Sequence, residues 1–412
     1  MSHTGDMDLV QVRRAYKFRA YPTRPQEGRA VRLLADHCDL YDAALMERRE
    51  AWRMRQARVS YGMQSAQLTE IRKADMEGQG RHSFTAQQQT LRRLDAVFAA
   101  FFGRAKAAQK SRTNTKPGYP RFKPYQRFSQ VRFVNGDGAT WVPAGRPGWA
   151  RARFQAIGSV KVRQHRAVTG TVKALQLKRE HRRWYVIVVA EIEPVPLPAT
   201  GRAIGVDLGV ARFLTTSDGQ VVANPRFLAA SADVIADLQR RKARARPGSG
   251  NCKRLRRALA REWRKVRNRR RDFHHKTART LVDSCEMIAL EQLNTAGMTR
   301  RPAPEPDPGT PGGFLPNRAA AKAGLNTSIL DAGWYQFRAI LVGKAESAGR
   351  QVALVNPAGT SITCHQCGQR CERPRQDTVI CPVHGEMDAD VNAARNIFTR
   401  VGLGSGQAAT AA

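Results

Sequence analysis

The chain has 412 residues, of which 42% are hydrophobic and 25% charged, and its formal net charge is +36. This composition excludes a disordered chain and allows two or three folded domains. The positive surplus predicts a polyanionic partner, with nucleic acid the first candidate and an anionic membrane the second. No apolar run approaches the ~20 residues needed to cross a bilayer, and the N-terminus lacks the apolar core of a signal peptide. We therefore expect a cytoplasmic protein with no membrane partner.

The first half of the chain predicts a helical region between two β-rich regions. Residues 10–22 alternate apolar and mostly basic side chains, which is typical of a strand that ends at Pro22. From residue 24 to about residue 110 apolar residues recur at three-to-four spacing, which predicts helices. Residues 174–193 predict a β-hairpin about a turn at 180–182. This order fits a helical domain inserted into a small β-domain.

Residues 111–133 interleave cations with aromatic rings, which suits a nucleic-acid backbone with exposed bases. The candidate contacts are Arg121, Lys123 and Arg127. The alternative is a β-domain in which the rings form the core, with Phe122 and Phe133 buried. Both interpretations stay open. The rings concerned are Tyr119, Phe122, Tyr125, Phe128 and Phe133.

A second domain begins at residues 203–209, an apolar strand followed by another strand and a Ser-Asp-Gly turn. Residues 230–282 predict long helices. Between Arg240 and Lys276 there are 17 Arg and Lys against two acidic residues. A solvated helix normally mixes the two signs, so we expect a surface that faces phosphates. The candidate contacts are Arg254, Arg257, Arg264, Arg267, Arg270 and Lys276.

The remaining elements include a Pro- and Gly-rich loop that cannot form a packed element. They are, in chain order, a buried strand at 284–293, the loop at 300–316, one helix through 325–349, a strand at 352–357 and a helix at 390–402.

Three carboxylates stand at the ends of buried elements. Asp207 ends one apolar strand, Glu291 ends another, and Asp390 begins the last helix, with Asp388 just before it. A parallel sheet can bring these ends together, and carboxylate oxygens are the ligands that Mg²⁺ prefers. Two such ions could clamp the oxygens of a phosphoryl displacement. Alternatively, each acid is simply solvated, with Asp388 an N-cap and Asp390 in the first helical turn.

The seven cysteines are too few for a disulfide scaffold, but four of them cluster. Cys364-x2-Cys367 and Cys381-x2-His384 form two knuckles separated by 13 residues, as in a zinc ribbon. We take His384 as the fourth ligand and Cys371 as its competitor. Because all four positions are filled by protein, the zinc should be structural.

Three motifs carry a resemblance to a known family. GVDLG (205–209), IALEQLN (288–294) and DADVNAARNI (388–397) resemble the three motifs of the RuvC-type nuclease domain. Their form is similar to that of the transposon-encoded TnpB proteins and the related miniature type V CRISPR effectors. Further motifs resemble the family in the expected order, namely YKFRAYPTRPQ (16–26), GYPRFK (118–123), RRRDFHHKTA (269–278), LNTSILDAGW (325–334) and CHQCG (364–368).

The resemblance implies a multidomain α/β fold: an RNase H-like RuvC domain with an inserted zinc ribbon, and an N-terminal β-barrel wedge domain that carries an inserted helical recognition domain. It implies RNA-guided cleavage of double-stranded DNA, with guide pairing and a short flanking motif giving specificity. Asp207, Glu291 and Asp390 would be the catalytic residues and hold two Mg²⁺. The cofactors would be Mg²⁺, one structural Zn²⁺ and the guide RNA.

The implied boundaries divide the chain into seven segments. They are a wedge β-domain (1–23 and 113–198), the helical recognition domain between its parts (24–112), a RuvC-like nuclease domain (199–358, with a mobile loop at 300–316), a zinc-ribbon segment that binds target nucleic acid (359–386), the final RuvC helix (387–403) and a disordered tail (404–412).

Three other functions compete with this one. A guide-dependent DNA-binding repressor would lack a carboxylate, whereas all three are present. A transposase-like strand-transfer enzyme could use the same metal chemistry but would join ends and need no guide. A generic basic RNA-binding protein leaves the carboxylates unexplained.

Overall fold

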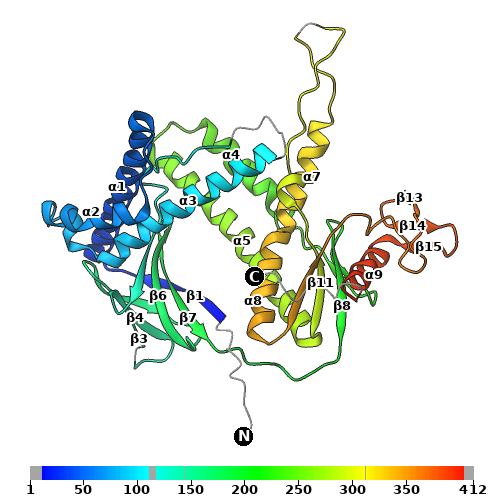
Figure 1. Cartoon of the computed structure of the whole chain (residues 1–412), viewed down its shortest axis with the longest axis horizontal. Helices are drawn as coiled ribbons and strands as arrows, with labels where there is room; N and C mark the ends of the chain where they lie inside the picture. Colours follow the sequence, from blue (N-terminus) through cyan, green and yellow to red (C-terminus); the bar gives the residue numbers. More distant parts are fainter. Residues whose placement is uncertain (1–11, 111–116, 144, 311, 403–412) are drawn as a thin grey trace. The chain divides into compact units, whose positions relative to one another are not determined.

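The computed structural model describes residues 12–110, 117–143, 145–310 and 312–402. The chain divides into two compact units, Met1–Glu193 and Pro194–Ala412, which are described separately (Figure 1). The predicted tail at 404–412, the first eleven residues of the predicted wedge domain and residues 111–116 lie outside the described residues. No helix within the described ranges has the length and apolar character needed to span a membrane.

A closed barrel forms the β part of the first unit. Its strand order is β1-β5-β4-β3-β2-β6-β7. In β1, the predicted alternation is confirmed, because Tyr16, Phe18 and Ala20 are buried inside while the residues between them are more exposed. The strands are β1 (Val12–Tyr21), β2 (Gln130–Asn135), β3 (Gly138–Pro143), β4 (Trp149–Phe154), β5 (Gly158–Arg163), β6 (Thr171–Glu180) and β7 (Arg183–Ile192).

Helices occupy the chain between β1 and β2, as the apolar spacing predicts. Thr23 caps the first of them in a capping box with Gln26, which fixes the exit from the barrel strand. Leu33 and Leu91 of the helices share one core with Phe133 of the barrel. The helices are α1 (Arg24–Arg55), α2 (Tyr61–Ala74), a 3₁₀ turn η1 (Gln79–Arg81) and α3 (Phe84–Lys110).

The aromatic rings of residues 119–133 divide into buried and exposed ones, and a nucleic-acid contact by the exposed rings stays a prediction. Phe128 and Phe133 are buried in the core, whereas Tyr119, Phe122 and Tyr125 are 41%, 45% and 57% exposed. The interpretation that placed Phe122 in the core is therefore wrong, because this ring lies on a segment without regular structure ahead of the barrel strand.

A five-stranded sheet forms the centre of the second unit. Its order is β10-β9-β8-β11-β12, in which β8, β11 and β12 run parallel, β9 pairs antiparallel with β8, and β10 pairs antiparallel with β9. The strands are β8 (Ala203–Leu208), β9 (Arg212–Thr216), β10 (Val221–Ala223), β11 (Met287–Glu291) and β12 (Gln351–Val355).

Helices cover both faces of this sheet. On one face, Ile288 and Leu290 pack in a core with Phe337 of α8. On the other face, Ala289 packs with Ile397 of α9. Alternate residues of β11 thus face opposite layers, as the period of a strand requires. The helices are a 3₁₀ turn η2 (Ala229–Ser231), α4 (Ala232–Arg244), α5 (Gly250–Ser284), α6 (Thr295–Met298), α7 (Ala319–Ala332), α8 (Trp334–Ser347) and α9 (Ala389–Gly402).

One predicted helix is in fact two. The prediction of a single helix through 325–349 is wrong, because α7 ends and α8 begins at Gly333. Gly333 has φ +67°, a left-handed conformation that closes α7 when its N–H donates to the Ile329 carbonyl. The apolar spacing continues across this break, so periodicity alone does not reveal it.

The Pro- and Gly-rich segment projects from the second unit beyond α7 (Figure 1). It forms an irregular hairpin with one bridge, Pro306 to Phe314, and Phe314 is 65% exposed. Its mobility remains a prediction.

Candidate active site and metal-binding knuckles

Two of the predicted carboxylates lie at neighbouring strand ends. β8 and β11 are parallel with Val206 opposite Leu290, so Asp207 and Glu291 follow at the same level of the sheet. Gly205 faces α9, since a Cβ there would lie 2.1 Å from the Ala394 carbonyl oxygen. Asp207, two residues later, faces the same side. Glycine at 205 therefore lets α9 approach close to the strand that carries Asp207.

The third carboxylate is placed by the start of α9. Oδ1 of Asp388 accepts the N–H groups of Asp390 and Val391, each at 3.0 Å, so Asp388 caps the helix and Asp390 stands in its first turn. Oδ2 of Asp388 accepts from Arg212 at 2.7 Å, and the same guanidinium lies 3.7 Å from Asp390. The hydrogen bonds of Asp388 thus agree with the alternative in which this residue is the N-cap of the last helix.

All three carboxyl groups have a raised pKa, and the charges of Glu291 and Asp390 both act on Asp207. Burial, followed by the charges of Glu291 and Asp390, raises the pKa of Asp207 to about 8. Burial, with the charge of Asp388, raises the pKa of Asp390, and burial raises the pKa of Glu291. A group of carboxylates that resist joint ionisation is a donor set that fits hard divalent cations.

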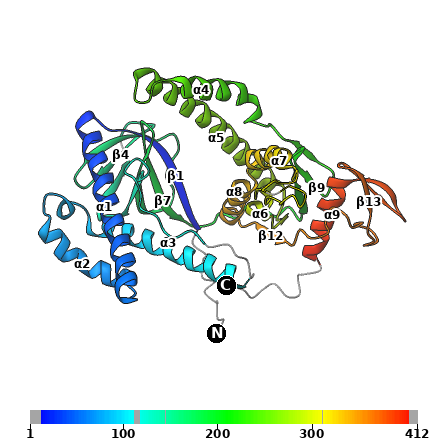
Figure 2. The same cartoon turned by 90° about the horizontal axis from the view of Figure 1, so that it is seen from above.

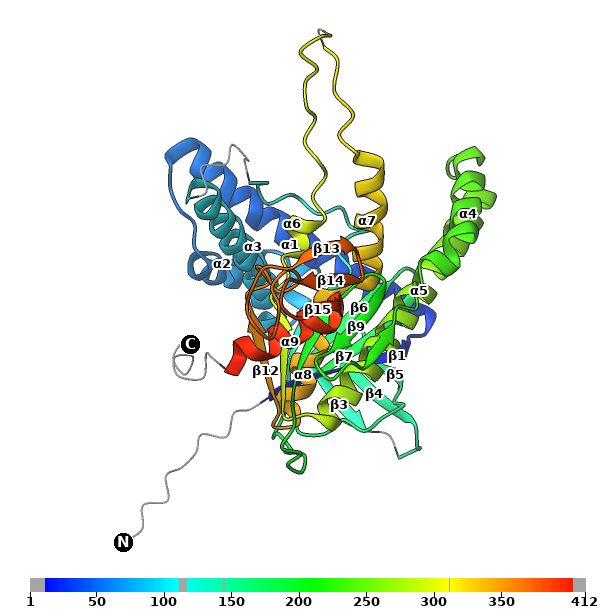
Figure 3. The same ribbon diagram turned by 90° about the vertical axis from the view of Figure 1, so that its right-hand side faces the viewer.

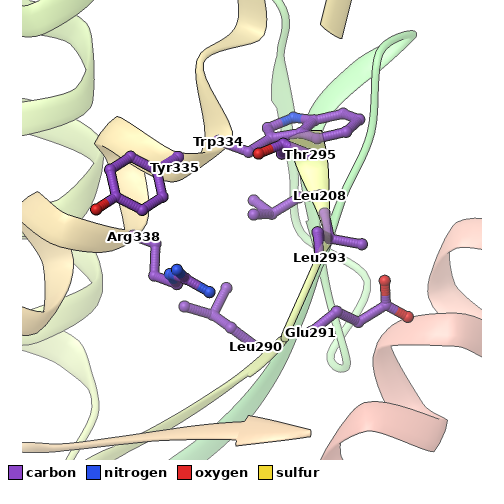
Figure 4. Close-up of a pocket in the computed structure, with 8 residues that line it drawn as sticks. All are labelled: Leu208, Leu290, Glu291, Leu293, Thr295, Trp334, Tyr335 and Arg338. Atoms are coloured by element: carbon purple, nitrogen blue, oxygen red, sulfur yellow. The ribbon is translucent and has the colours of Figure 1, made fainter. Parts of the chain in front are cut away.

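Glu291 is oriented toward the α9 side of the sheet. Glu291 lines a small pocket with Trp334, Tyr335 and Arg338, but its carboxylate points away from Tyr335 and Arg338 (Figure 4). Glu291 is 8% exposed, and it accepts a hydrogen bond from the hydroxyl of Thr360.

Three residues near the carboxylates are absent from the sequence predictions. Thr360 contacts Glu291, Arg212 contacts Asp388, and the charge of Arg373 acts on both Asp207 and Asp390. Threonine and arginine have no distinctive spacing in these segments. The only signal in the sequence is that each lies within a few residues of a motif.

The predicted zinc ligands meet in one place. Ligand atoms of Cys364, Cys367, Cys381 and His384 all lie within 4.8 Å of one another. Nδ1 of His384 is 3.5 Å from the Cys364 sulfur and 3.6 Å from the Cys381 sulfur. Three thiols and an imidazole are a donor set that fits tetrahedral Zn²⁺. Cys371, the competitor, is buried beside this group but is not part of it.

A three-stranded sheet and two turns build these knuckles. Gly368 and Gly385 follow the two knuckles with φ +73° and +72°, which favour glycine. Burial raises the pKa of the Cys381 thiol, but backbone N–H groups of Val383 and His384 outweigh it and lower the value to about 6. The sheet comprises β13 (Glu372–Arg375), β14 (Thr378–Cys381) and β15 (Gly385–Asp388), and β15 leads directly into α9 (Figure 3).

Two family models match the chain. One, described as "Probable transposase" (OrfB_IS605), matches residues 186–301. The other, the Cas12f1-like TNB domain, matches residues 334–397, which include the knuckles and Asp390.

Two relatives match almost the whole chain. A Streptomyces pristinaespiralis protein named as an RNA-guided DNA endonuclease is 31% identical over 98% of this chain and 92% of its own length. The Escherichia coli protein InsQ, named in the same way, is 31% identical over 93% of this chain and 91% of its own length. The chain belongs to the TnpB-like family of RNA-guided DNA endonucleases.

A solved structure supports the fold of this TnpB-like chain. The Cas12f1 chain of a Cas12f1–sgRNA–target DNA complex matches with a TM-score of 0.53 at 12% identity, covering 94% of this chain and 98% of that one. With the closed barrel and the mixed sheet, this match confirms the predicted multidomain α/β fold class.

The predicted phosphate contacts of this TnpB-like chain differ in availability. α4 folds back alongside α5 (Figure 2), and on α5 Arg254, Arg257 and Arg267 are exposed, while Arg264 is half-buried. Arg270 instead pairs with Asp331 inside the unit. Arg270 is therefore less available to phosphates than the exposed arginines of α5.

Lys276, also on α5, is exposed and pairs with Asp272 at 2.8 Å. In the first unit Arg121 and Arg127 are exposed. Lys123 is partly buried, with its amine 4.2 Å from the centre of the Tyr41 ring. It is thus less available to phosphates than the two arginines.

Proposed function

We propose that the chain is an RNA-guided endonuclease that hydrolyses phosphodiesters of target DNA with Asp207, Glu291 and Asp390. The observation that supports this proposal is the placement of Asp207, Glu291 and Asp390 on neighbouring elements of the second unit, where burial, followed by the charges of Glu291 and Asp390, raises the pKa of Asp207 to about 8. Such a cluster is electrostatically unfavourable unless cations neutralise it.

Asp207, Glu291 and Asp390 would hold two divalent cations. When bound, these ions would supply an activated water and stabilise the departing oxygen. The chain's own contribution is orientation. Gly205 admits α9 close to β8, and Asp388 fixes the first turn of α9 that carries Asp390. Arg212 neutralises part of the charge beside Asp390.

Guide RNA would supply the specificity, by pairing with one DNA strand while the protein binds a short flanking motif. The net charge of +36 and the exposed arginines of α5 support binding of such a polyanion. Zn²⁺ at Cys364, Cys367, Cys381 and His384 would be structural, because four protein donors leave no open position.

A cleavage assay tests the proposal. The guide is identified by sequencing RNA that co-purifies with the protein, and a matching double-stranded target is then incubated with Mg²⁺. We expect cleavage by the wild type, none in EDTA, and a loss of at least about 10³-fold in Glu291→Gln with guide and target binding retained. Glu346→Gln, at an exposed glutamate of α8, should cleave normally. Unchanged cleavage by Glu291→Gln would contradict the assignment.

The description of one matching family model as "Probable transposase" favours one second candidate, DNA strand transfer by the same carboxylates. Strand transfer joins a 3′ end to a new phosphate, whereas hydrolysis leaves broken ends. Sequencing the reaction products separates the two.

A further inference from the structure

Thr360 lies where the segment between β12 and α9 leaves the sheet. It is 2% exposed. Its hydroxyl donates to Oε1 of Glu291 and also lies 3.0 Å from the Pro357 carbonyl oxygen. Its own carbonyl accepts a hydrogen bond of 2.9 Å from the side chain of Asn396 in α9. One buried residue thus touches both the strand that ends in Glu291 and the helix whose first turn holds Asp390.

Two asparagines of α9 extend this connection toward the knuckles. The amides of Asn392 and Asn396 donate to the Thr363 carbonyl at 2.8 and 2.6 Å. The side-chain oxygen of Asn392 accepts the N–H of His365 at 2.9 Å. These hydrogen bonds fix the turn of residues 357–365 against α9. The turn includes Cys364, the first cysteine of the knuckles.

A glutamate side chain has three rotatable bonds, so a buried carboxylate needs a partner to hold one orientation. Among the described residues, the hydrogen bond to the Glu291 carboxylate comes from Thr360. Hydrogen-bond partners of metal-ligating carboxylates commonly set both the orientation and the affinity of the site.

We propose that Thr360 is a positioning residue, which holds the Glu291 carboxylate toward Asp207 and links its orientation to α9. This inference rests on the proposed function, since it assumes that Glu291 holds a divalent cation. It makes the zinc-binding segment part of the nuclease centre: the turn that leads into the knuckles also supports a catalytic carboxylate.

Two substitutions separate the hydroxyl from the shape of the side chain. Thr360→Val keeps the shape and removes the donor, whereas Thr360→Ser keeps the donor and removes a methyl group. Thr327→Val is the matched control, because Thr327 stands at an exposed position of α7 and its hydroxyl donates to the Ala323 carbonyl within the same helix.

The measurements are cleavage rate against Mg²⁺ concentration and the rise in melting temperature on adding Mg²⁺ to the protein without nucleic acid. For Thr360→Val we expect the Mg²⁺ concentration at half-maximal rate to rise about 10- to 100-fold, with a smaller Mg²⁺-induced rise in melting temperature. Thr360→Ser should stay within about threefold of the wild type, and zinc content and target binding should be unchanged in both.

The outcomes are distinguishable. A Thr360→Val protein that keeps its zinc and has the wild-type Mg²⁺ requirement would overturn the positioning role. So would an equal defect in Thr360→Ser, because the methyl group and not the hydroxyl would then matter. If the wild type neither cleaves nor responds to Mg²⁺, the proposed function itself fails, and this inference with it.

Discussion

Replacing Asp207 with asparagine should abolish cleavage but stabilise the metal-free protein. Asp207 shares one face of the sheet with Glu291 and Asp390, and burial together with these two charges raises its pKa to about 8. The asparagine side chain has nearly the same shape as that of aspartate and carries no charge. The substitution therefore removes the electrostatic cost while leaving the packing against α9 in place.

The sign and size of the expected change in the free energy of unfolding follow from proton linkage. A carboxyl whose pKa is higher in the folded chain than its value of about 3.9 in the unfolded chain destabilises the fold as pH rises from about 4 to 8. For Asp207 alone the shift to about 8 corresponds to about 4 kcal/mol at pH 7. Because the three carboxyl groups can share protons, we expect Asp207→Asn to raise the free energy of unfolding by about half of that value, or about 2 kcal/mol.

Thermal unfolding in EDTA measures the effect. A gain of about 2 kcal/mol should raise the melting temperature of the second unit by about 4 to 8 °C at pH 7. At pH 5 the gain should shrink to about a third, since most of the linked protons are exchanged above that pH. Mg²⁺ should stabilise the wild type more than Asp207→Asn, because it binds only the intact carboxylate cluster. Asp233→Asn, at an exposed position of α4, serves as the control.

An Asp207→Asn protein that melts at or below the wild-type temperature at both pH values would refute the reasoning. It would show that the Asp207 carboxylate is compensated in the metal-free protein, and that the cluster has no inherent demand for cations.

Three further predictions concern Gly205, the clustered cysteines and the projecting Pro- and Gly-rich segment. Gly205→Ala should lower stability by about 3 kcal/mol and impair cleavage, because the added Cβ meets the backbone of α9. Gly343→Ala, at an exposed position of α8 with open space around it, should raise stability by up to about 1 kcal/mol, and chemical denaturation measures both changes. Cys364→Ser should lose the bound zinc and Cys371→Ser should keep it, and elemental analysis measures the zinc content of both. Loss of zinc from Cys371→Ser would make Cys371, and not His384, the fourth ligand. Deleting 302–312 should shift the melting temperature by less than about 3 °C, because this projecting segment is outside the core; a larger drop would contradict its placement.

The carboxylates were predictable because each follows a local rule. Asp207 and Glu291 lie at the carboxyl ends of short apolar strands, and Asp390 lies in the first turn of an amphipathic helix. The carboxyl ends of neighbouring parallel strands meet at one edge, so topology brings the first two together. The knuckles were predictable for a similar reason, since ligand spacing within a tight turn is a local property.

What the sequence does not reveal depends on contacts between distant residues. The hydroxyl of Thr360 reaches Glu291 across 69 residues, and no periodicity marks it. Arg270 shows the opposite case: its place in a basic helix suggested a phosphate contact, but the fold supplies Asp331 as its partner. For Asp388 the sequence offered an N-cap as one alternative, and only the geometry shows that both its oxygens are engaged, one by α9 and one by Arg212.

The central claim is that guide RNA directs carboxylate-dependent cleavage of DNA. The most direct measurement pairs two guides with two targets in Mg²⁺ and compares the wild type with Asp390→Asn. Each guide should direct the wild type to cut only its own target, and Asp390→Asn should bind the same target without cutting it. Cleavage that ignores the guide, or that persists in Asp390→Asn, would contradict the account.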